Sequence, residues 1–164
     1  MDKHEGRRGK RILRIAGVIS HERPHTPDAQ ALIAKLESSL VALYPNESRH
    51  GYSVEKLLRE EVAFFVVRED GVPAGCGGVQ LFGTEYGELK RMYLRFRGLG
   101  LGRMMLHRLA DYAREHGVGL LRLETGIYQK EAIGLYEGFG FARIRPFGEY
   151  KSDPLSMFFE KRIL

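Results

Sequence analysis

Three alternating glycines between a predicted strand and a predicted helix constrain this chain more than any other feature. The run is Arg97-Gly98-Leu99-Gly100-Leu101-Gly102-Arg103. It follows a strand-like segment over 86–94 and precedes an amphipathic segment over 101–116. Glycine lets the backbone adopt a positive φ and approach a ligand closely. The first turn of a helix also leaves N–H groups unpaired, with partial positive charge. The run therefore predicts a phosphate-binding loop, with a tight structural turn as the alternative.

The length and composition predict an ordinary globular protein. The 164 residues are 43% hydrophobic and 29% charged, and we expect a single domain over 12–164. No apolar run approaches the ~20 residues of a membrane helix, and the N-terminus lacks the apolar stretch of a signal peptide. One cysteine, Cys76, rules out an internal disulfide, and no Cys/His spacing suggests a metal site. We therefore expect a cytoplasmic protein with no metal and no membrane contact.

The positive net charge is concentrated at the N-terminus. Residues 1–11 hold five basic and two acidic side chains, a net of +3, whereas the rest of the chain holds 21 and 19, a net of +2. This distribution predicts a disordered basic tail over 1–11 and no nucleic-acid partner. A weak contact between the tail and a polyanion is the alternative.

Hydrophobic periodicity and turn residues predict an α+β order of elements. Thr26 is a candidate N-cap for a helix that runs from Pro27 to near Pro45, and Asp70-Gly71 predicts a hairpin turn. A helical connection between the strands at 86–94 and 120–124 makes these two strands parallel. The result is a mixed, mostly antiparallel sheet of about six to seven strands with helices on both faces. The predicted strands are 12–19, 62–68, 72–82, 86–94, 120–124, 141–145 and 157–162, and the other predicted helices are 53–60, 101–116 and 131–137.

The glycine run differs from two common phosphate-binding motifs. A P-loop ends in Lys and Ser or Thr, whereas Arg103 and Met104 follow the last glycine here. A dinucleotide fingerprint reads G-x-G-x-x-G, whereas this loop reads G-x-G-x-G. Glu124, at the end of the next predicted strand, is the best argument for a nucleotide, because a ribose-binding acid would lie there.

The residues resemble the GNAT superfamily of acyl-CoA-dependent N-acetyltransferases, and in particular a group of small bacterial members. Arg97-x-x-Gly100-x-Gly102 is similar to the family's R/Q-x-x-G-x-G/A signature, and the segment 132–141 is similar to its L-Y-x-x-x-G-F segment. The order of elements agrees from about Ile12 onward. The resemblance implies a sheet splayed between the Met92 and Leu120 strands, with acetyl-CoA as co-substrate. It also implies direct acetyl transfer to a primary amine, and often a homodimer.

The resemblance also implies which residues bind the coenzyme. Backbone groups of the strand end would bind the pantetheine arm, and those of the glycine run would bind the pyrophosphate. The residues implied are Met92, Tyr93, Leu94, Arg97, Gly98, Leu99, Gly100, Leu101, Gly102, Arg103 and Gln129. Two features depart from the family pattern. The segment 94–97 is about two residues short, so Arg95 is a candidate for part of the role of Arg97. Gln129 replaces a common Asn and offers the same hydrogen-bonding groups on a longer stem.

Three residues are candidates for proton transfer. Tyr136 matches the family tyrosine that protonates the departing thiolate, and a core aromatic is the alternative. Glu88 is the candidate base that accepts the amine proton, and it shares a strand face with Met92 if no bulge intervenes. An ion pair with Lys90 or Arg91 is the alternative for Glu88. Glu124 competes as base, with a strand-end ion pair as its alternative.

Two loops are expected to flank the acceptor channel, namely residues 44–50 and 147–150. Glu47 and Glu149 are candidates to hold a cationic amine, whereas Arg49, His50 and Arg145 are candidates to hold a carboxylate, as in an amino acid. Ordinary solvated loops are the alternative. The sequence thus predicts a small-molecule amine or amino acid as acceptor. A protein N-terminus or lysine, or a non-catalytic acyl-CoA-binding module, remains as an alternative.

Overall fold

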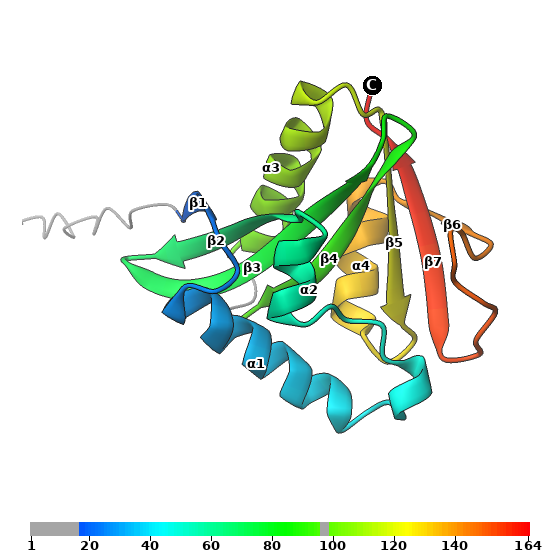
Figure 1. Ribbon diagram of the computed structural model, residues 1–164, viewed down its shortest axis with the longest axis horizontal. Helices are drawn as coiled ribbons and strands as arrows, with labels where there is room; N and C mark the ends of the chain where they lie inside the picture. The colour runs from blue at the N-terminus through cyan, green and yellow to red at the C-terminus, as the bar shows by residue number, and fades with distance from the viewer. Residues whose placement is uncertain (1–16, 96–98) are drawn as a thin grey trace, which may run out of the picture.

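The computed structural model describes residues 17–95 and 99–164, and within them one seven-stranded mixed sheet forms the centre of the protein (Figure 1). The strand order is β1-β2-β3-β4-β5-β7-β6. Neighbouring strands are antiparallel except β4 and β5, which are parallel, as the helical crossover predicted. The strands are β1 (Val18–Glu22), β2 (Ala63–Glu69), β3 (Val72–Phe82), β4 (Tyr86–Leu94), β5 (Leu120–Gly126), β6 (Ala142–Ile144) and β7 (Ser156–Arg162).

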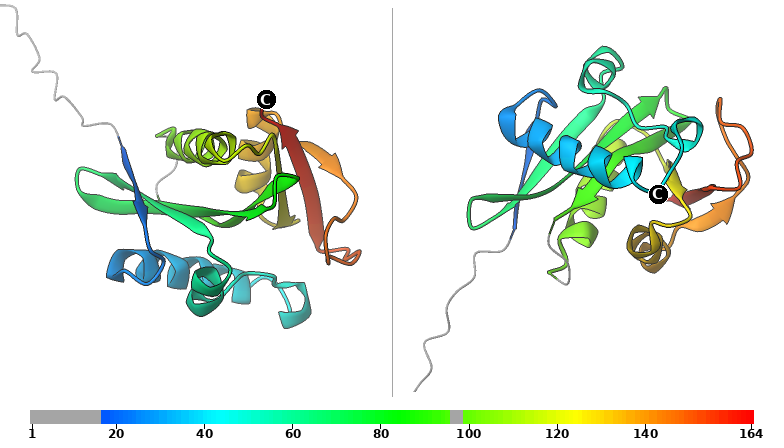
Figure 2. Two further views of the ribbon diagram at one scale, coloured as in Figure 1. Left: turned by 45° about the horizontal axis from the view of Figure 1, so that its top comes forward. Right: turned by 90° about the horizontal axis from the view of Figure 1, so that it is seen from below.

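Helices cover both faces of the sheet, as predicted (Figure 2). On one face lie α1 (Pro27–Val41) and α2 (Val54–Arg59), which pack Leu32, Leu57 and neighbours against β2 and β3. On the other face lie α3 (Leu101–Glu115) and α4 (Lys130–Phe139). Their apolar stripes meet the sheet in a larger core that includes Met105 and Leu109, both with 0% of their surface exposed. The sheet is therefore the middle layer of three.

Local signals set most of the element ends. The Oγ1 atom of Thr26 accepts a hydrogen bond from the Ala29 N–H at 3.4 Å, so the predicted N-cap of α1 is confirmed. Asp70 and Gly71 have φ values of 50° and 76°, the positive values that a tight hairpin turn requires at both positions.

Three predicted boundaries are wrong. The first strand, expected over 12–19, is β1 at Val18–Glu22, and residues 12–16 lie outside the described residues. The first helix ends at Val41, ahead of a short 3-10 turn over Asn46–Ser48. The last helix continues through Gly138 and is closed by Gly140 with a φ of 103°, because only the second glycine takes the left-handed conformation that ends a helix.

The sheet opens between β4 and β5, as the resemblance implied. In the described chain the parallel ladder consists of two pairs, Gly87 with Leu121 and Glu88 with Arg122. Beyond Glu88 the two strands diverge, while β4 remains paired with β3 as far as Leu94 and β5 with β7 as far as Gly126. The edge of β4 from Leu89 onward is thus open toward β5.

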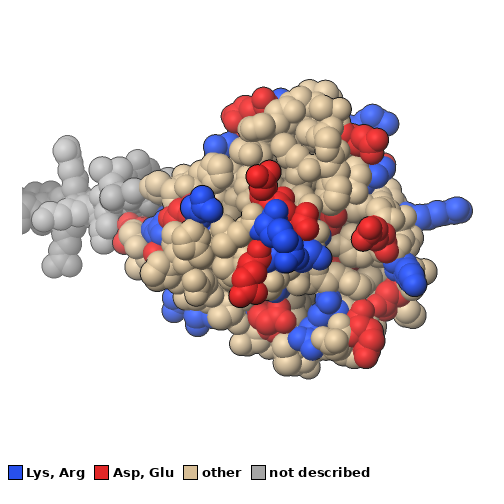
Figure 3. Space-filling view, in the orientation of Figure 1, with Lys and Arg blue, Asp and Glu red and all other residues tan. Residues whose placement is uncertain are grey.

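The surface carries charges of both signs. On the face in Figure 3, Lys and Arg side chains alternate with Asp and Glu side chains, and neither sign forms a continuous patch. Among the described helices, none has the length and apolar character needed to cross a membrane. The predicted basic tail over 1–11 lies outside the described residues.

Candidate active site

Two adjacent cavities lie at the opening between β4 and β5. The larger, which we call the wide groove, has a volume of about 710 Å³ and lies between the end of β4, the start of α3 and the start of α4. The smaller, the inner pocket, has a volume of about 110 Å³ and lies between the middle of β4, the end of β5 and the segment 44–51. The two cavities share the side chains of Leu36, Met92, Gln129, Ala132 and Tyr136.

The glycine run forms one end of the wide groove. Gly100 has a φ of 71° and precedes α3, and among the described residues no side chain caps the first-turn N–H groups of this helix, so these groups can meet a ligand. Leu99, Gly100, Leu101, Gly102 and Arg103 all line this end. The predicted Arg97 and Gly98 lie outside the described residues.

The glycines of this run have different structural roles. A Cβ on Gly100 would meet no described atom within 4 Å, so its backbone conformation, rather than crowding, calls for glycine. A Cβ on Gly102 would lie 2.7 Å from Leu135 of α4, so this glycine permits close contact between α3 and α4. The alternative of a structural turn therefore accounts for part of the motif.

The open end of β4 forms the floor of the wide groove. Met92, Tyr93 and Leu94 line it, and so does Arg95, the residue expected to share the role of Arg97. Because β4 has diverged from β5 here, its open edge can pair with an extended ligand as a strand would.

The remaining predicted coenzyme residues occupy distinct places. Gln129 precedes α4 and lines both cavities. The side chain of Leu101 is 3% exposed and belongs to the core, so its contribution to the groove is its backbone. The guanidinium of Arg103 lies 5.5 Å from the centre of the Phe139 ring.

Helix α1 supplies a wall that sequence reasoning missed. Lys35, Leu36 and Ser39 of α1 line the wide groove, and so does Leu43, two residues after the helix. Their spacing follows one edge of an amphipathic helix, but nothing in that pattern distinguishes a groove wall from an ordinary half-exposed helix edge.

Tyr136 lies where the two cavities meet. Its side chain lines both of them, and its ring also packs in the core beside Phe141, with the ring centres 5.8 Å apart. Burial, with a smaller contribution from the negative charge of Glu124, raises the pKa of Tyr136. The phenol therefore stays protonated and remains a hydrogen-bond donor at neutral pH.

A β-bulge in β4 corrects one expectation about Glu88. Lys90 pairs with Gly78 and Tyr93 with Cys76, so Arg91 and Met92 together oppose the single residue Gly77. Arg91 has a φ of 53°, the left-handed conformation common at such bulges. The extra residue reverses the alternation of side chains, and Met92 packs into the core under α3. Glu88 and Met92 therefore do not share a face, contrary to the expectation for an unbulged strand.

The carboxylate of Glu88 is held within the protein. Its Oε2 atom lies 2.6 Å from Lys90 Nζ and accepts a hydrogen bond of 2.6 Å from the Tyr150 hydroxyl. Lys90 Nζ also lies 4.0 Å from the centre of the Tyr52 ring. Glu88 is 3% exposed and is absent from the lining of both cavities among the described residues, whereas Lys90 and Tyr150 line the inner pocket. The structure thus contains the ion pair with Lys90 that the sequence offered as the alternative role of Glu88.

Glu124 is the carboxylate of the inner pocket. It lies near the end of β5 and lines this pocket together with Lys90 and Arg91 of β4. Burial raises the pKa of Glu124 to about 7. A carboxyl group with such a pKa can exchange a proton near neutral pH, which is the property that a general base or acid requires.

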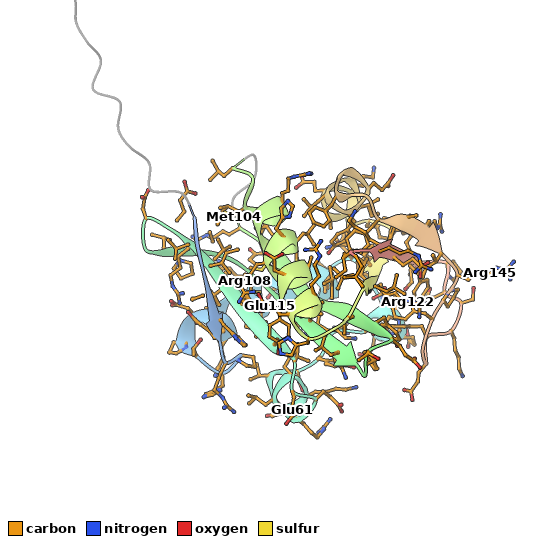
Figure 4. The ribbon with its side chains drawn as sticks, turned by 90° about the horizontal axis from the view of Figure 1, so that it is seen from above. Glu61, Met104, Arg108, Glu115, Arg122 and Arg145 are labelled. Atoms are coloured by element: carbon orange, nitrogen blue, oxygen red, sulfur yellow. The ribbon has the colours of Figure 1, made fainter. Side chains whose placement is uncertain are left out.

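The predicted acceptor loops reach the inner pocket in part. Tyr44, Ser48, Arg49 and His50 line it from the first loop, and Tyr150 lines it from the second. Glu47, Glu149 and Arg145 are absent from its described lining, and Arg145 lies at the outer edge of the molecule (Figure 4).

Cys76 is a packing residue. It is 0% exposed, and its thiol donates a hydrogen bond of 3.3 Å to the carbonyl oxygen of Arg91 at the bulge. Burial raises the pKa of Cys76 to about 12, so the nucleophilic thiolate is scarce at neutral pH.

Comparison with known proteins identifies the family that this arrangement belongs to. Residues 29–141 match the model of the acetyltransferase (GNAT) family. The IAA acetyltransferase of Azospirillum brasilense is 43% identical over 147 residues, covering 87% of this chain and 95% of that protein. The chain belongs to the GNAT family. It is therefore an N-acetyltransferase that uses an acyl-CoA donor.

Solved structures of other GNAT proteins share the fold. A Klebsiella pneumoniae protein classed as an acyl-CoA N-acyltransferase is 33% identical, with a TM-score of 0.76 over 90% of this chain and 98% of that chain. The PaiA N-acetyltransferase of Thermoplasma acidophilum, solved with coenzyme A, is 20% identical, with a TM-score of 0.69 over 90% of this chain and 99% of that one. The predicted family and fold class are thus confirmed.

Proposed function

We propose that this GNAT enzyme transfers an acetyl group from acetyl-CoA directly to the amine of a small molecule. The observation that carries the proposal is the pair of unequal cavities that meet at Tyr136. A groove of about 710 Å³ suits the long coenzyme, whereas a pocket of about 110 Å³ suits a small acceptor.

The coenzyme would lie in the wide groove. The free N–H groups at the start of α3 suit a pyrophosphate, because they add hydrogen bonds to the positive end of the helix dipole. The open edge of β4 over 92–94 suits the amide groups of the pantetheine arm. The PaiA structure, which shares this fold, holds coenzyme A and supports the assignment.

Glu124 is the base that we favour for the acceptor. A protonated amine has a pKa of ~10 and must lose a proton before it attacks. Glu124 lines the pocket where that amine would lie, and its raised pKa of about 7 narrows the gap for proton transfer. Glu88 is the weaker candidate, because Lys90 and Tyr150 already occupy its carboxylate.

Tyr136 is the residue that we assign to the leaving group. Its position between the cavities suits a phenol that donates a hydrogen bond to sulfur. The burial that raises the pKa of Tyr136 would also raise that of a thiolate beside it, so proton transfer between them stays feasible.

The proposed reaction balances without a covalent enzyme intermediate. The ammonium gives one proton to Glu124, and the amine nitrogen then bonds to the thioester carbonyl carbon as the carbon–sulfur bond breaks. Sulfur gains a proton from Tyr136, the nitrogen loses a second proton that restores the Tyr136 hydroxyl as the amide forms, and Glu124 gives the first proton to water. The products are an N-acetylated amine, a free thiol and one proton released to water.

Two measurements with the full-length protein test this function. Calorimetry should show saturable binding of coenzyme A and no comparable binding of NAD, and thiol release from acetyl-CoA should depend on an added small amine. Mass spectrometry of the products should place the acetyl group on the amine. Binding of NAD in preference to coenzyme A, or acetylation of proteins but of no small amine, would contradict the proposal.

A further inference from the structure

In one corner of the inner pocket, positively charged side chains outnumber the negatively charged ones. Arg49 Nη1 lies 3.2 Å from Glu37 Oε1, and Arg91 Nη1 lies 2.9 Å from Glu37 Oε2. Two guanidinium groups thus share one carboxylate of α1. The Arg91 side chain is 5% exposed and that of Arg49 is 22% exposed, so water does little to screen the excess charge.

Each of these arginines also has a buried donor without an acceptor. Arg49 Nε and Arg91 Nη1 have no hydrogen-bond partner in the described part of the chain, since the contact between Arg91 Nη1 and Glu37 lacks hydrogen-bond geometry. A buried donor left unpaired is destabilising, because no hydrogen bond compensates for the loss of its hydration. Both residues line the inner pocket, so the excess positive charge of the pair acts on a ligand bound there.

The backbone around Arg91 holds its guanidinium in this place. The bulge of β4 directs the side chain toward α1, and Arg91 Nε donates a hydrogen bond of 2.8 Å to the Tyr52 carbonyl. A Cβ on Gly51 would lie 2.2 Å from Arg91 Nη1, so the absence of a side chain at Gly51 makes room for the group.

Glu124 lies in the same pocket and is negatively charged when it is ionised. Lys90, the third cation of the lining, is already paired with Glu88. The pocket therefore offers one site for a cation and one for an anion.

We propose that the acetyl acceptor is a small amine that also carries a carboxylate, such as an amino acid, and that Arg49 and Arg91 bind this carboxylate. A planar carboxylate matches the fork of a guanidinium and accepts from two donors at once. The amine of the same molecule faces Glu124, which takes its proton. This inference rests on the proposed acetyl transfer and adds the chemical class of the acceptor.

Matched acceptors test the class of substrate. Thiol release from acetyl-CoA should be measured with free amino acids, with their carboxamides and with the corresponding decarboxylated amines. Both analogues lack the carboxylate and therefore lose its charge-assisted hydrogen bonds, which contribute about 1.5–3 kcal/mol. We expect kcat/KM to be about 10- to 100-fold lower for both than for the amino acid. A series with the amine two, three or four carbons from the carboxylate measures the separation of the two sites.

A pair of arginine variants tests the assignment of residues. Arg49→Gln should reduce the preference for the amino acid over its carboxamide about tenfold or more, mainly by raising KM. Arg145→Gln removes the same charge from the outer edge and should retain the preference. Arg49→Lys, which keeps the charge but loses the fork, should fall between Arg49→Gln and the unmodified enzyme. Thermal unfolding of each variant identifies any loss of fold.

The outcomes separate this inference from the proposed function. If the carboxamide or the decarboxylated amine is acetylated as well as the amino acid, the carboxylate proposal is wrong while acetyl transfer stands. If Arg49→Gln keeps the full preference, the assignment to this arginine pair is wrong. If coenzyme A does not bind and no amine releases thiol, the failure lies in the proposed function itself.

Discussion

The wide groove and the inner pocket meet at Tyr136, yet they are built from different parts of the chain. The groove depends mainly on backbone: the first-turn N–H groups of α3 and the open edge of β4 over 92–94. The pocket depends on charged and phenolic side chains from segments far apart in sequence, such as Arg49, Lys90 and Glu124. Backbone groups are present whatever the side chains are, so a site built from them suits a ligand that a whole family shares. A site built from side chains can bind a different ligand after a few amino-acid substitutions.

The largest effect should come from the carboxylate of the inner pocket. Glu124→Gln should lower kcat by about 10²- to 10⁴-fold, because the amine then lacks its base. Binding of coenzyme A, measured by calorimetry, should remain. The activity of the unmodified enzyme should rise with pH with a midpoint near 7, the value to which burial raises the pKa of Glu124.

Glu88→Gln is the matched comparison for this first prediction. It removes the other buried carboxylate of the region, which is already paired with Lys90 and Tyr150. If Glu88→Gln abolishes the rise with pH and Glu124→Gln preserves it, the base is Glu88 and the preference for Glu124 is wrong.

A second, smaller effect is expected where the two cavities join. Tyr136→Phe keeps the ring in its core position and removes the hydroxyl, so kcat should fall about 10- to 100-fold with little change in stability. Stopped-flow measurement of thiol release should place the loss in the chemical step. Unchanged turnover would mean that Tyr136 is only a core aromatic.

A third prediction concerns the backbone of the groove. Gly100→Ala should weaken coenzyme A binding about 3- to 10-fold, because alanine disfavours a φ of 71° by about 1–2 kcal/mol and the start of α3 must adjust. The KM for the acceptor should stay nearly the same. Gly134→Ala is the control, since a Cβ there meets no described atom within 4 Å and α4 gains a better helix former. Equal effects of the two variants on coenzyme binding would contradict the role of Gly100.

The last prediction concerns stability and again the inner pocket. The pKa of Glu124 is raised from 4.5 to about 7 on folding, so the folded state holds this proton more tightly than the unfolded chain. Its contribution to stability is full below pH 4.5 and is lost as the pH rises through 7. The fall in unfolding free energy between pH 5 and pH 8 should therefore be smaller by about 1–3 kcal/mol in Glu124→Gln.

Chemical denaturation at both pH values measures this difference in the protein without coenzyme. Glu47→Gln, which removes a carboxylate from the exposed 3-10 turn, is the control and should follow the unmodified protein. The stability prediction is wrong if Glu124→Gln shows the same pH dependence as this control.

The parts of the fold that could be predicted from the sequence are those that depend on local signals. The cap at Thr26, the turn at Asp70-Gly71 and the glycine run each act within a few residues, and the order of all eleven predicted elements agrees with the structure. The end of α4 was missed because Gly138 and Gly140 are equally plausible stops in sequence, and only packing decides which takes a positive φ.

The sequence by itself determined the family, the order of elements and the backbone site at the start of α3, because these depend on short segments and their spacing. Only the tertiary structure decided which carboxylate lines the inner pocket. One extra residue at Arg91 reverses the faces of β4, and pairing with Lys90 and Tyr150 removes Glu88 from the cavity. The physical reason is that burial and charge pairing depend on residues far apart in the chain, such as Glu37, Arg49 and Arg91, that the fold alone brings together.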